Sequence, residues 1–440
     1  MLKPLPQSPI VTDGFSAARG SVLTPAGLGL FRRFMIFVGP GYLVATGYMD
    51  PGNWATALAA GSEFGMRLLF VAVLSSLMAI VLQALSARLA FGANLDLAQA
   101  CRAHLPRRVT IFLWLTQEAA ILATDLAEVI GTAIGLELLF GLPLWLGALF
   151  TALDVGLILA FERFGFRKLE GFVISLLIVI SCCFAAQLAL ARPDWAEAAR
   201  GLLPSSDIAT NPKMLYLALG ILGATVMPHN LFLHSGIVQT RAVAPDISAR
   251  REAIRFALAD SALALLFAMV INGAILVLAA ATFFAHDHKE VATIADAYRL
   301  IAPVLGAPLA AKLFAIALIA CGLNSSLTAT LAGQLIMDGF VRMRLSPAGR
   351  RLITRALTIT PAVVTTLIAG EDAVSRLLVL SQVALSFALP FAILPLVFFT
   401  GSRRIMGPFV AARATTLLAG AIGVGITLLN VKLIYDSVFG

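Results

Sequence analysis

Apolar stretches of about 20 residues recur along most of this 440-residue chain. Each is long enough to cross the roughly 30 Å hydrocarbon core of a bilayer as a helix. Hydrophobic residues make up 60% of the sequence and charged residues only 13%, whereas a typical soluble domain is about 25% charged. A water-soluble fold of this size could not bury such an apolar excess, so the sequence predicts an all-α membrane protein.

The stretches predict eleven transmembrane helices. They lie at 33–61, 66–90, 110–136, 143–161, 169–190, 214–239, 256–284, 300–337, 352–370, 375–400 and 412–435. Residues 1–32 are expected to form a cytosolic N-terminal tail, because they lack the apolar core and small-residue cleavage site of a signal peptide. Residues 33–440 are expected to form a single transmembrane domain.

The basic residues orient the spans. With the N-terminus in the cytoplasm, most of the 32 Lys and Arg residues fall in cytoplasmic segments, as the positive-inside rule requires. An odd number of spans then puts the C-terminus outside. Because topology accounts for the net charge of +8, no nucleic acid is expected as a partner. We expect a multi-pass protein of the cell membrane, plasma or inner.

Two spans carry a helix break beside polar residues. The first contains Asp50-Pro51-Gly52-Asn53 and the sixth contains Met227-Pro228-His229-Asn230. Proline removes an amide donor and clashes with the preceding turn, so each helix should unwind at its break. The breaks fall in the first span of two five-span blocks, about 33–190 and 214–400. This pairing predicts inverted repeats with a substrate site between them, and leaves 412–435 as an extra span.

The groups at the breaks predict a divalent metal ion as the transported substrate. Asp50 and Asn53 offer oxygens, and unwinding would free backbone carbonyls near Gly47 and Ala224. Met227 adds a thioether, which Mg²⁺ and Ca²⁺ do not favour but first-row transition metals tolerate. This set suits Mn²⁺ or Fe²⁺, whereas a structural zinc site would want cysteine and histidine. No cofactor is expected.

Three carboxylates in the third span predict a route for protons. Glu118, Asp125 and Glu128 are spaced by seven and three residues, which puts them near one helical face. Buried carboxylates with raised pKa values can hold and pass protons. The alternative is that these acids form static ion pairs with arginines such as Arg351, and both can hold at once.

Other polar groups in the spans extend this picture. His229 in the sixth span and Arg241 just beyond its cytoplasmic end are further titratable or ion-pairing groups, so we expect the proton path to lead from near Asp50 toward the cytoplasm. Gln382 is a polar residue in the apolar tenth span. Taken alone, it predicts a hydrogen bond between helices.

The two break motifs together resemble the Nramp family of proton-coupled divalent metal transporters, of the bacterial manganese transporter type. The similarity covers roughly residues 33–436, and Thr124-Asp125-Leu126-Ala127-Glu128 and Leu380-Ser381-Gln382 are also similar to family segments. The resemblance implies a LeuT-like fold. In that fold spans 1–5 and 6–10 form inverted repeats, and spans 1 and 6 are discontinuous.

The resemblance also implies roles for individual residues. Metal would be bound by the side chains of Asp50, Asn53 and Met227 with the Ala224 carbonyl, and a carbonyl near Gly47 or Gln382 would join in particular conformations. Proton roles would fall to Asp50, Asp125 and Glu128, with His229, Glu118, Arg241 and Arg351 in the surrounding network. Gly47 stands where the family often has alanine.

The sequence therefore predicts a secondary active transporter that imports Mn²⁺, Fe²⁺ and similar ions with protons by alternating access. The broken spans would move against a scaffold containing spans three, four, eight and nine. The alternative is a small-solute or amino-acid carrier of the same architecture, against which the acidic side chain of Asp50 argues. An enzyme is not expected, since neither His-Glu-x-x-His nor Gly-x-Ser-x-Gly occurs. The expected partners are the metal ion, protons and the lipid bilayer, with no obligate protein partner.

Overall fold

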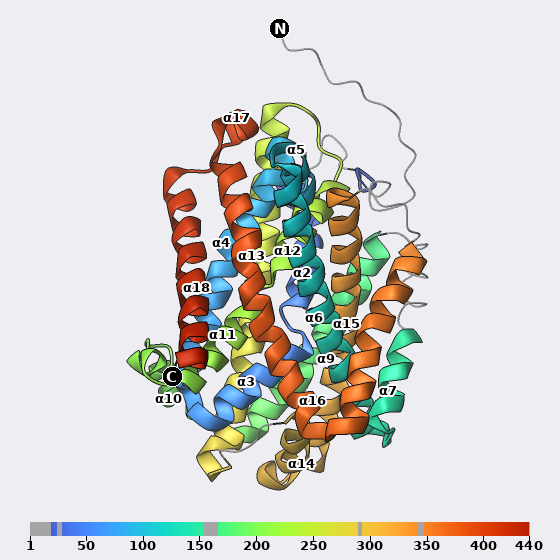
Figure 1. The fold of residues 1–440 in the computed structure, drawn as a ribbon, viewed down its shortest axis with the longest axis vertical. Coiled ribbons are helices and arrows are strands. Elements are labelled where there is room, and N and C mark those ends of the chain that lie inside the picture. Colours follow the sequence, from blue (N-terminus) through green and yellow to red (C-terminus); the bar gives the residue numbers. More distant parts are fainter. Residues whose placement is uncertain (1–18, 24–28, 154–165, 289–292, 342–346, 440) are drawn as a thin grey trace.

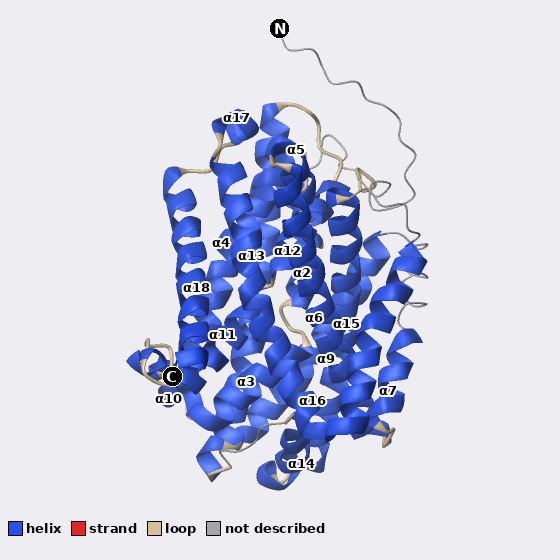
Figure 2. Ribbon diagram, in the orientation of Figure 1, coloured by secondary structure: helices blue, strands red, loops and turns tan. Residues whose placement is uncertain are grey.

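A computed structural model describes residues 19–23, 29–153, 166–288, 293–341 and 347–439 (Figure 1). Within these ranges a few side chains, that of Arg351 among them, are not described. Helices form nearly all of the described chain, and no strand occurs in it (Figure 2). The one strand-like contact is an isolated parallel bridge between Val22 and Arg241. The predicted all-α class is confirmed.

The helices follow one another with short connections. In chain order they are α1 (Leu30–Phe37), α2 (Pro40–Gly47), α3 (Pro51–Phe64), α4 (Leu69–Ala93), α5 (Leu97–His104), α6 (Arg107–Phe140), α7 (Leu144–Phe150), α9 (Phe166–Ala191), α10 (Trp195–Arg200), α11 (Pro212–Val226), α12 (Pro228–Ile237), α13 (Ile247–Thr282), α14 (Ile294–Leu305), α15 (Pro308–Phe340), α16 (Pro347–Gly401), α17 (Arg403–Met406) and α18 (Arg413–Phe439). Short 3₁₀ turns, such as η5 (Val238–Thr240), join some of them.

Several helical stretches are long and apolar enough to cross a membrane. Among the described residues there are eight: Pro51–Ala93, Arg107–Phe140, Arg167–Ala191, Pro212–Thr240, Ile247–His286, Pro308–Phe340, Ala373–Gly401 and Arg413–Val438. Shorter apolar helices cover Leu144–Leu153 and Leu352–Ile368. The count of eleven spans stays a prediction, because the first span is divided into short helices and the fourth runs into 154–165, outside the described residues.

Both predicted helix breaks are present. α2 ends at Gly47 and α3 begins at Pro51, while α11 ends at Val226 and α12 begins at Pro228. Each proline occupies the first turn of the second half-helix, where its missing N–H costs no hydrogen bond. The sequence therefore ends one helix and restarts the next within three residues.

One predicted span differs from the structure. The stretch 300–337 was expected to be one span, but α14 and α15 are separate helices with Gly306 between them at a φ of 62°. Left-handed glycine ends a helix, and Pro308 starts the next. The predicted spans 352–370 and 375–400 are separated as expected, by a kink within α16 at Gly370, whose φ of 77° is not helical.

The broken helices lie in the middle of the bundle (Figure 1). α3 and α2 pack against α13, and α11 packs against α16, α3 and α4. α6 packs against both α15 and α16. In Figure 1, α5 and α17 mark one end of the molecule and α14 the other. We call them the α5 end and the α14 end.

Candidate metal centre

Asp50 occupies the break between α2 and α3. It caps α3, because its Oδ1 accepts a hydrogen bond from the Asn53 N–H at 2.8 Å. The side chain is fully buried, and within the described structure Oδ2 has no hydrogen-bond partner and no lysine or arginine pairs with the carboxylate. An uncompensated buried carboxylate is costly, so a cation bound at Oδ2 would stabilise it.

Asn53 joins the two breaks. Its Nδ2 donates to the Tyr48 carbonyl at 2.7 Å and to the Ala224 carbonyl at 2.9 Å. The Tyr48 carbonyl also accepts from Nδ2 of Asn272 in α13 at 2.7 Å. The unwound segment of the first broken helix is thus held against α11 and α13 by side-chain amides.

Met227 is the single residue between α11 and α12. It is fully buried, and its backbone has a φ of 31°, which side-chain-bearing residues seldom adopt. The chain passes from one helix to the next at this residue, and the thioether lies in the protein interior. Nδ2 of Asn230 donates to the Met227 sulfur at 3.5 Å.

Gln382 lies in α16 directly against the first break. A Cβ at Gly52 would overlap the Gln382 amide, and one at Gly223 would overlap the Gln382 carbonyl oxygen. Its Nε2 donates to Ser381 Oγ at 3.1 Å, while its Oε1 is buried without a partner among the described residues. Gln382 therefore reaches both broken helices.

These groups fit a divalent cation. The buried oxygens of Asp50 and Gln382 that lack partners, together with the Met227 thioether, form a mixed donor set of the kind that Mn²⁺ and Fe²⁺ accept. No cluster of three or more His, Cys, Asp or Glu side chains suited to a metal occurs in the described part of the chain.

Asp125 and Glu128 of α6 meet one arginine. Arg355 of α16 places Nη1 4.0 Å from Asp125 Oδ1 and Nη2 3.8 Å from Glu128 Oε2, and it also donates to Ser326. Ser325 Oγ donates to Glu128 Oε1 at 2.7 Å. Two carboxylates, one guanidinium and two hydroxyls therefore form a buried polar cluster between α6, α15 and α16.

The sequence did not single out Arg355. It named Arg351, one helical turn earlier on the same helix, whose side chain lies outside the described residues. The spacing of four residues puts both arginines on one face of α16. The pattern that pointed to Arg351 therefore applied equally to Arg355. Glu118, also on α6, accepts a hydrogen bond at its Oε1 from Trp114 Nε1 at 2.9 Å.

The residues predicted within and just beyond the sixth span, His229 and Arg241, lie apart from one another. His229, in the first turn of α12, is fully buried, and neither ring nitrogen has a partner among the described residues. Arg241, after η5, makes a two-pronged ion pair with Glu170 of α9 at 2.6 and 3.2 Å. Arg241 also donates to the carbonyls of Ile36 and Val38 at 3.0 and 3.1 Å. It therefore ties together α1, α9 and the end of α12.

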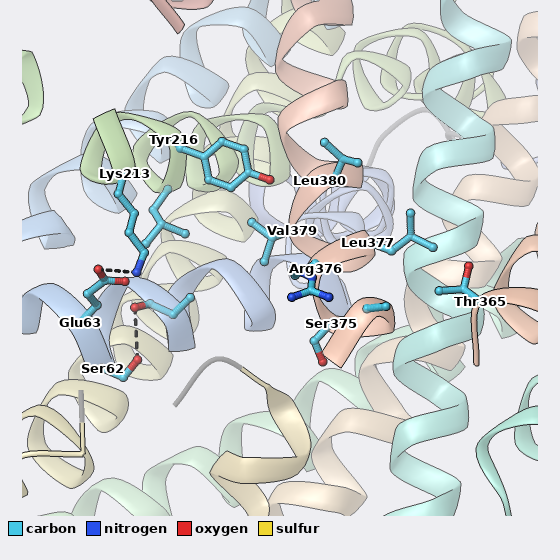
Figure 3. Close-up of a pocket in the computed structure, with 13 residues that line it drawn as sticks. Ser62, Glu63, Lys213, Tyr216, Thr365, Ser375, Arg376, Leu377, Val379 and Leu380 are labelled. Atoms are coloured by element: carbon cyan, nitrogen blue, oxygen red, sulfur yellow. Dashed lines mark hydrogen bonds and ion pairs between the residues drawn. The ribbon is translucent and has the colours of Figure 1, made fainter. Parts of the chain in front are cut away.

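A cavity of about 850 Å³ opens where α3 ends and α11 begins. α16 supplies its other wall, from Thr365 to Leu380. Figure 3 shows the lining residues Lys213 and Glu63 pointing toward each other, with their ion pair at 2.7 Å. None of the predicted metal ligands lines the cavity. Among the lining residues on α16, Leu380 is the closest in sequence to the predicted ligand Gln382, which follows it by two residues.

Comparison with known proteins points the same way. The family described as Natural resistance-associated macrophage protein-like, Nramp, matches residues 41–436. A divalent metal cation transporter MntH of Agrobacterium fabrum is 58% identical over 406 residues, which is 92% of this chain and 88% of that protein. The relatives reported by these comparisons are named as transporters and not as enzymes.

Solved structures share the fold. The Eremococcus coleocola manganese transporter, in complex with an aromatic bis-isothiourea substituted compound, is 40% identical with a TM-score of 0.89, covering 96% of this chain and 91% of that one. MhsT in complex with L-phenylalanine is 15% identical with a TM-score of 0.61, covering 90% and 97%, and shows the LeuT-like fold alone. The chain is a multi-pass membrane protein that belongs to the Nramp family.

Proposed function

We propose that this protein imports divalent transition metal ions, Mn²⁺ and Fe²⁺ foremost, together with protons by alternating access. The observation that carries the proposal is the buried Asp50 carboxylate, which has an oxygen without a partner in the described structure and lies at one of two adjoining helix breaks. The other break supplies a thioether. The names of the A. fabrum and E. coleocola relatives support a divalent metal and manganese as cargo.

The metal would be held by side chains from both repeats. Asp50, Asn53 and Met227 would bind through their side chains, and Ala224 through its carbonyl. That carbonyl now accepts from Asn53 Nδ2, so binding would require the amide to turn its oxygen toward the ion. The Gly47 carbonyl or Gln382 would complete the shell in particular conformations. A ligand set with one formal charge binds weakly enough to release its cargo.

Protons would move along the buried acids. Asp50 would exchange a proton as metal binds, and Asp125 and Glu128 would carry it onward beside Arg355. His229, Glu118, Arg241 and Arg351 are proposed to shape the field around this route. The ion pairs at Arg355 are also those of the static alternative, so support for proton movement comes from the burial of two acids around one cation.

The transport cycle would alternate access between the two ends of the molecule. We assign the α5 end to the cytoplasm, with the N-terminus inside and the C-terminus outside the cell membrane. Exposed Arg107 and Arg108 at the start of α6 support this assignment. The cavity beside Lys213 and Glu63 would then open outward. Residues 33–440 would act as one transporter domain, with repeats at 33–190 and 214–400.

The proposal is tested by metal uptake into proteoliposomes that contain only this protein, with internal pH recorded at the same time. Asp50→Ala should abolish Mn²⁺ uptake. Met227→Ala should relax discrimination against Ca²⁺ and Mg²⁺, because the remaining ligands are oxygens. Met214→Ala is the matched control, since Met214 is equally buried in α11 but away from the break.

The outcomes separate the parts of the proposal. Uptake that persists unchanged in Asp50→Ala would refute the metal centre. Metal uptake by the wild-type protein without acidification of the vesicle interior would leave the centre in place and refute proton coupling. If Met214→Ala and Met227→Ala enhanced Ca²⁺ uptake equally, the Met227 thioether would not be the group that discriminates against Ca²⁺.

A further inference from the structure

Asn230 is buried beside the proposed metal centre but is not one of the predicted metal ligands. It lies in the first turn of α12, three residues after Met227, and is fully buried. Its backbone N–H donates to the Met227 carbonyl at 3.2 Å, and its Nδ2 donates to the Met227 sulfur at 3.5 Å. Its Oδ1 has no hydrogen-bond partner in the described structure. Both donor groups of Asn230 are therefore directed at Met227.

Gly47 makes the space that this amide occupies. A Cβ at Gly47 would lie 2.5 Å from Asn230 Nδ2, 3.1 Å from Oδ1 and 3.2 Å from Cγ. The first of these distances is shorter than any real Cβ contact. Gly47 is helical in α2 and has no positive φ, so its backbone would accept alanine without strain. The three atoms nearest to an added Cβ at 47 therefore all belong to Asn230.

We infer that Asn230 is a positioning residue that holds the Met227 thioether toward the metal, and that Gly47 permits it to do so. Methionine has three rotatable bonds and fills space in many conformations. A hydrogen bond to its sulfur restricts those conformations before the ion arrives, which strengthens binding by removing part of the ordering cost. This inference rests on the proposed metal centre and adds a determinant of its selectivity.

The inference predicts an effect that depends on the metal. Cd²⁺ is soft and gains more from a thioether than Mn²⁺, which is satisfied by carboxylate and carbonyl oxygens. Without the Asn230 amide, Met227 would lose its preferred orientation. The KM for Cd²⁺ should then rise by up to about tenfold, the order set by freezing a methionine side chain, while the KM for Mn²⁺ changes by less than about threefold.

Gly47→Ala should have the same effect from the opposite side. The added methyl would push the Asn230 amide away from the sulfur, raising the ratio of the two KM values, Cd²⁺ over Mn²⁺. In the double variant Gly47→Ala/Asn230→Ala the methyl occupies the vacated space. The ratio should therefore equal that of Asn230→Ala alone, with no additive loss.

The experiment measures initial rates of Cd²⁺ and Mn²⁺ uptake into proteoliposomes for the wild type, the two single variants and the double variant. A second series places Asn230→Ala in a Met227→Ala background, where it should leave the KM ratio unchanged because no thioether remains to be held. A general packing defect would raise both KM values together and would persist in that background.

The outcomes are distinct from those of the proposed function. If the wild type carries neither metal, the proposed function fails and this inference falls with it. If the wild type carries both and Asn230→Ala and Gly47→Ala leave the KM ratio unchanged, only the role of Asn230 is overturned. If Asn230→Ala does not fold, Gly47→Ala alone decides, since it adds a helix-favouring methyl and removes nothing.

Discussion

Replacing Arg241 by leucine should destabilise the protein by about 3 kcal/mol. Its side chain has no exposed surface, and its partner Glu170 is 2% exposed. Removing one member of a buried ion pair typically costs about 3–5 kcal/mol, because the other charge stays buried without compensation. Arg167 would remain 3.1 Å from Glu170, but it is half exposed and compensates in part. The lower end of the range is therefore expected.

A double variant separates charge from packing. Glu170→Leu in the Arg241→Leu background removes the stranded carboxylate, and a buried ion pair replaced by apolar residues of similar volume is often nearly neutral. The double variant should thus be more stable than Arg241→Leu. The Ile36 carbonyl loses its Arg241 donor in both variants, so part of the loss remains, whereas the Val38 carbonyl keeps Arg167 Nη1 as a donor at 2.7 Å.

Thermal unfolding of the detergent-solubilised protein, followed by fluorescence of its four tryptophans, measures these differences. Arg404→Leu is the matched control, because Arg404 is exposed in α17 and its loss should change stability by no more than about 0.5 kcal/mol. A double variant no more stable than Arg241→Leu would show that the stranded charge of Glu170 is not the source of the loss, and would refute the reasoning.

Two further predictions concern a close helix contact and a buried acid. Gly131→Ala should cost about 1–3 kcal/mol in thermal unfolding, because its methyl would overlap the Pro51 ring, whereas Gly171→Ala, with open space around it, should not destabilise. Burial raises the pKa of Asp96, outside the membrane spans, to about 6, against about 3.9 unfolded. Stability should therefore fall by up to about 3 kcal/mol as pH rises from 4 to above 6. Asp96→Asn, which keeps the helix cap, should abolish that fall in pH-dependent melting curves.

Local chemistry made the helix breaks predictable. A proline beside glycine or polar residues in an apolar span pointed to a break, so Pro51 and Pro228 located the centre within one or two residues. Proline alone does not break a span, since Pro390 and Pro395 lie inside α16. Gly306 carried a similar signal between α14 and α15, but the continuous apolar character of 300–337 concealed it. The side-chain bonds of Asn53 that join the two breaks required the fold itself.

Partners across the bundle were less predictable. Glu170 lies 71 residues from Arg241, and nothing in either local sequence identifies the other. The structure places Arg355 beside Asp125 and Glu128, whereas the side chain of Arg351 lies outside the described residues. Whether an arginine faces an acid on another helix depends on how far its own helix is rotated and translated, which hydrophobic periodicity does not specify.

Each break sets two helix ends of opposite polarity side by side. α2 and α11 end there with their last carbonyls, the negative pole of the helix dipole, while α3 begins there with its first N–H groups, the positive pole. The positive pole stabilises the Asp50 carboxylate, and the negative poles attract a cation. Asp50 is the only formal charge among the proposed ligands, so a divalent ion bound there keeps a net charge of about +1. Fixed dipoles supply the rest of the attraction, and they remain in place, ready for the next ion, when the cargo leaves.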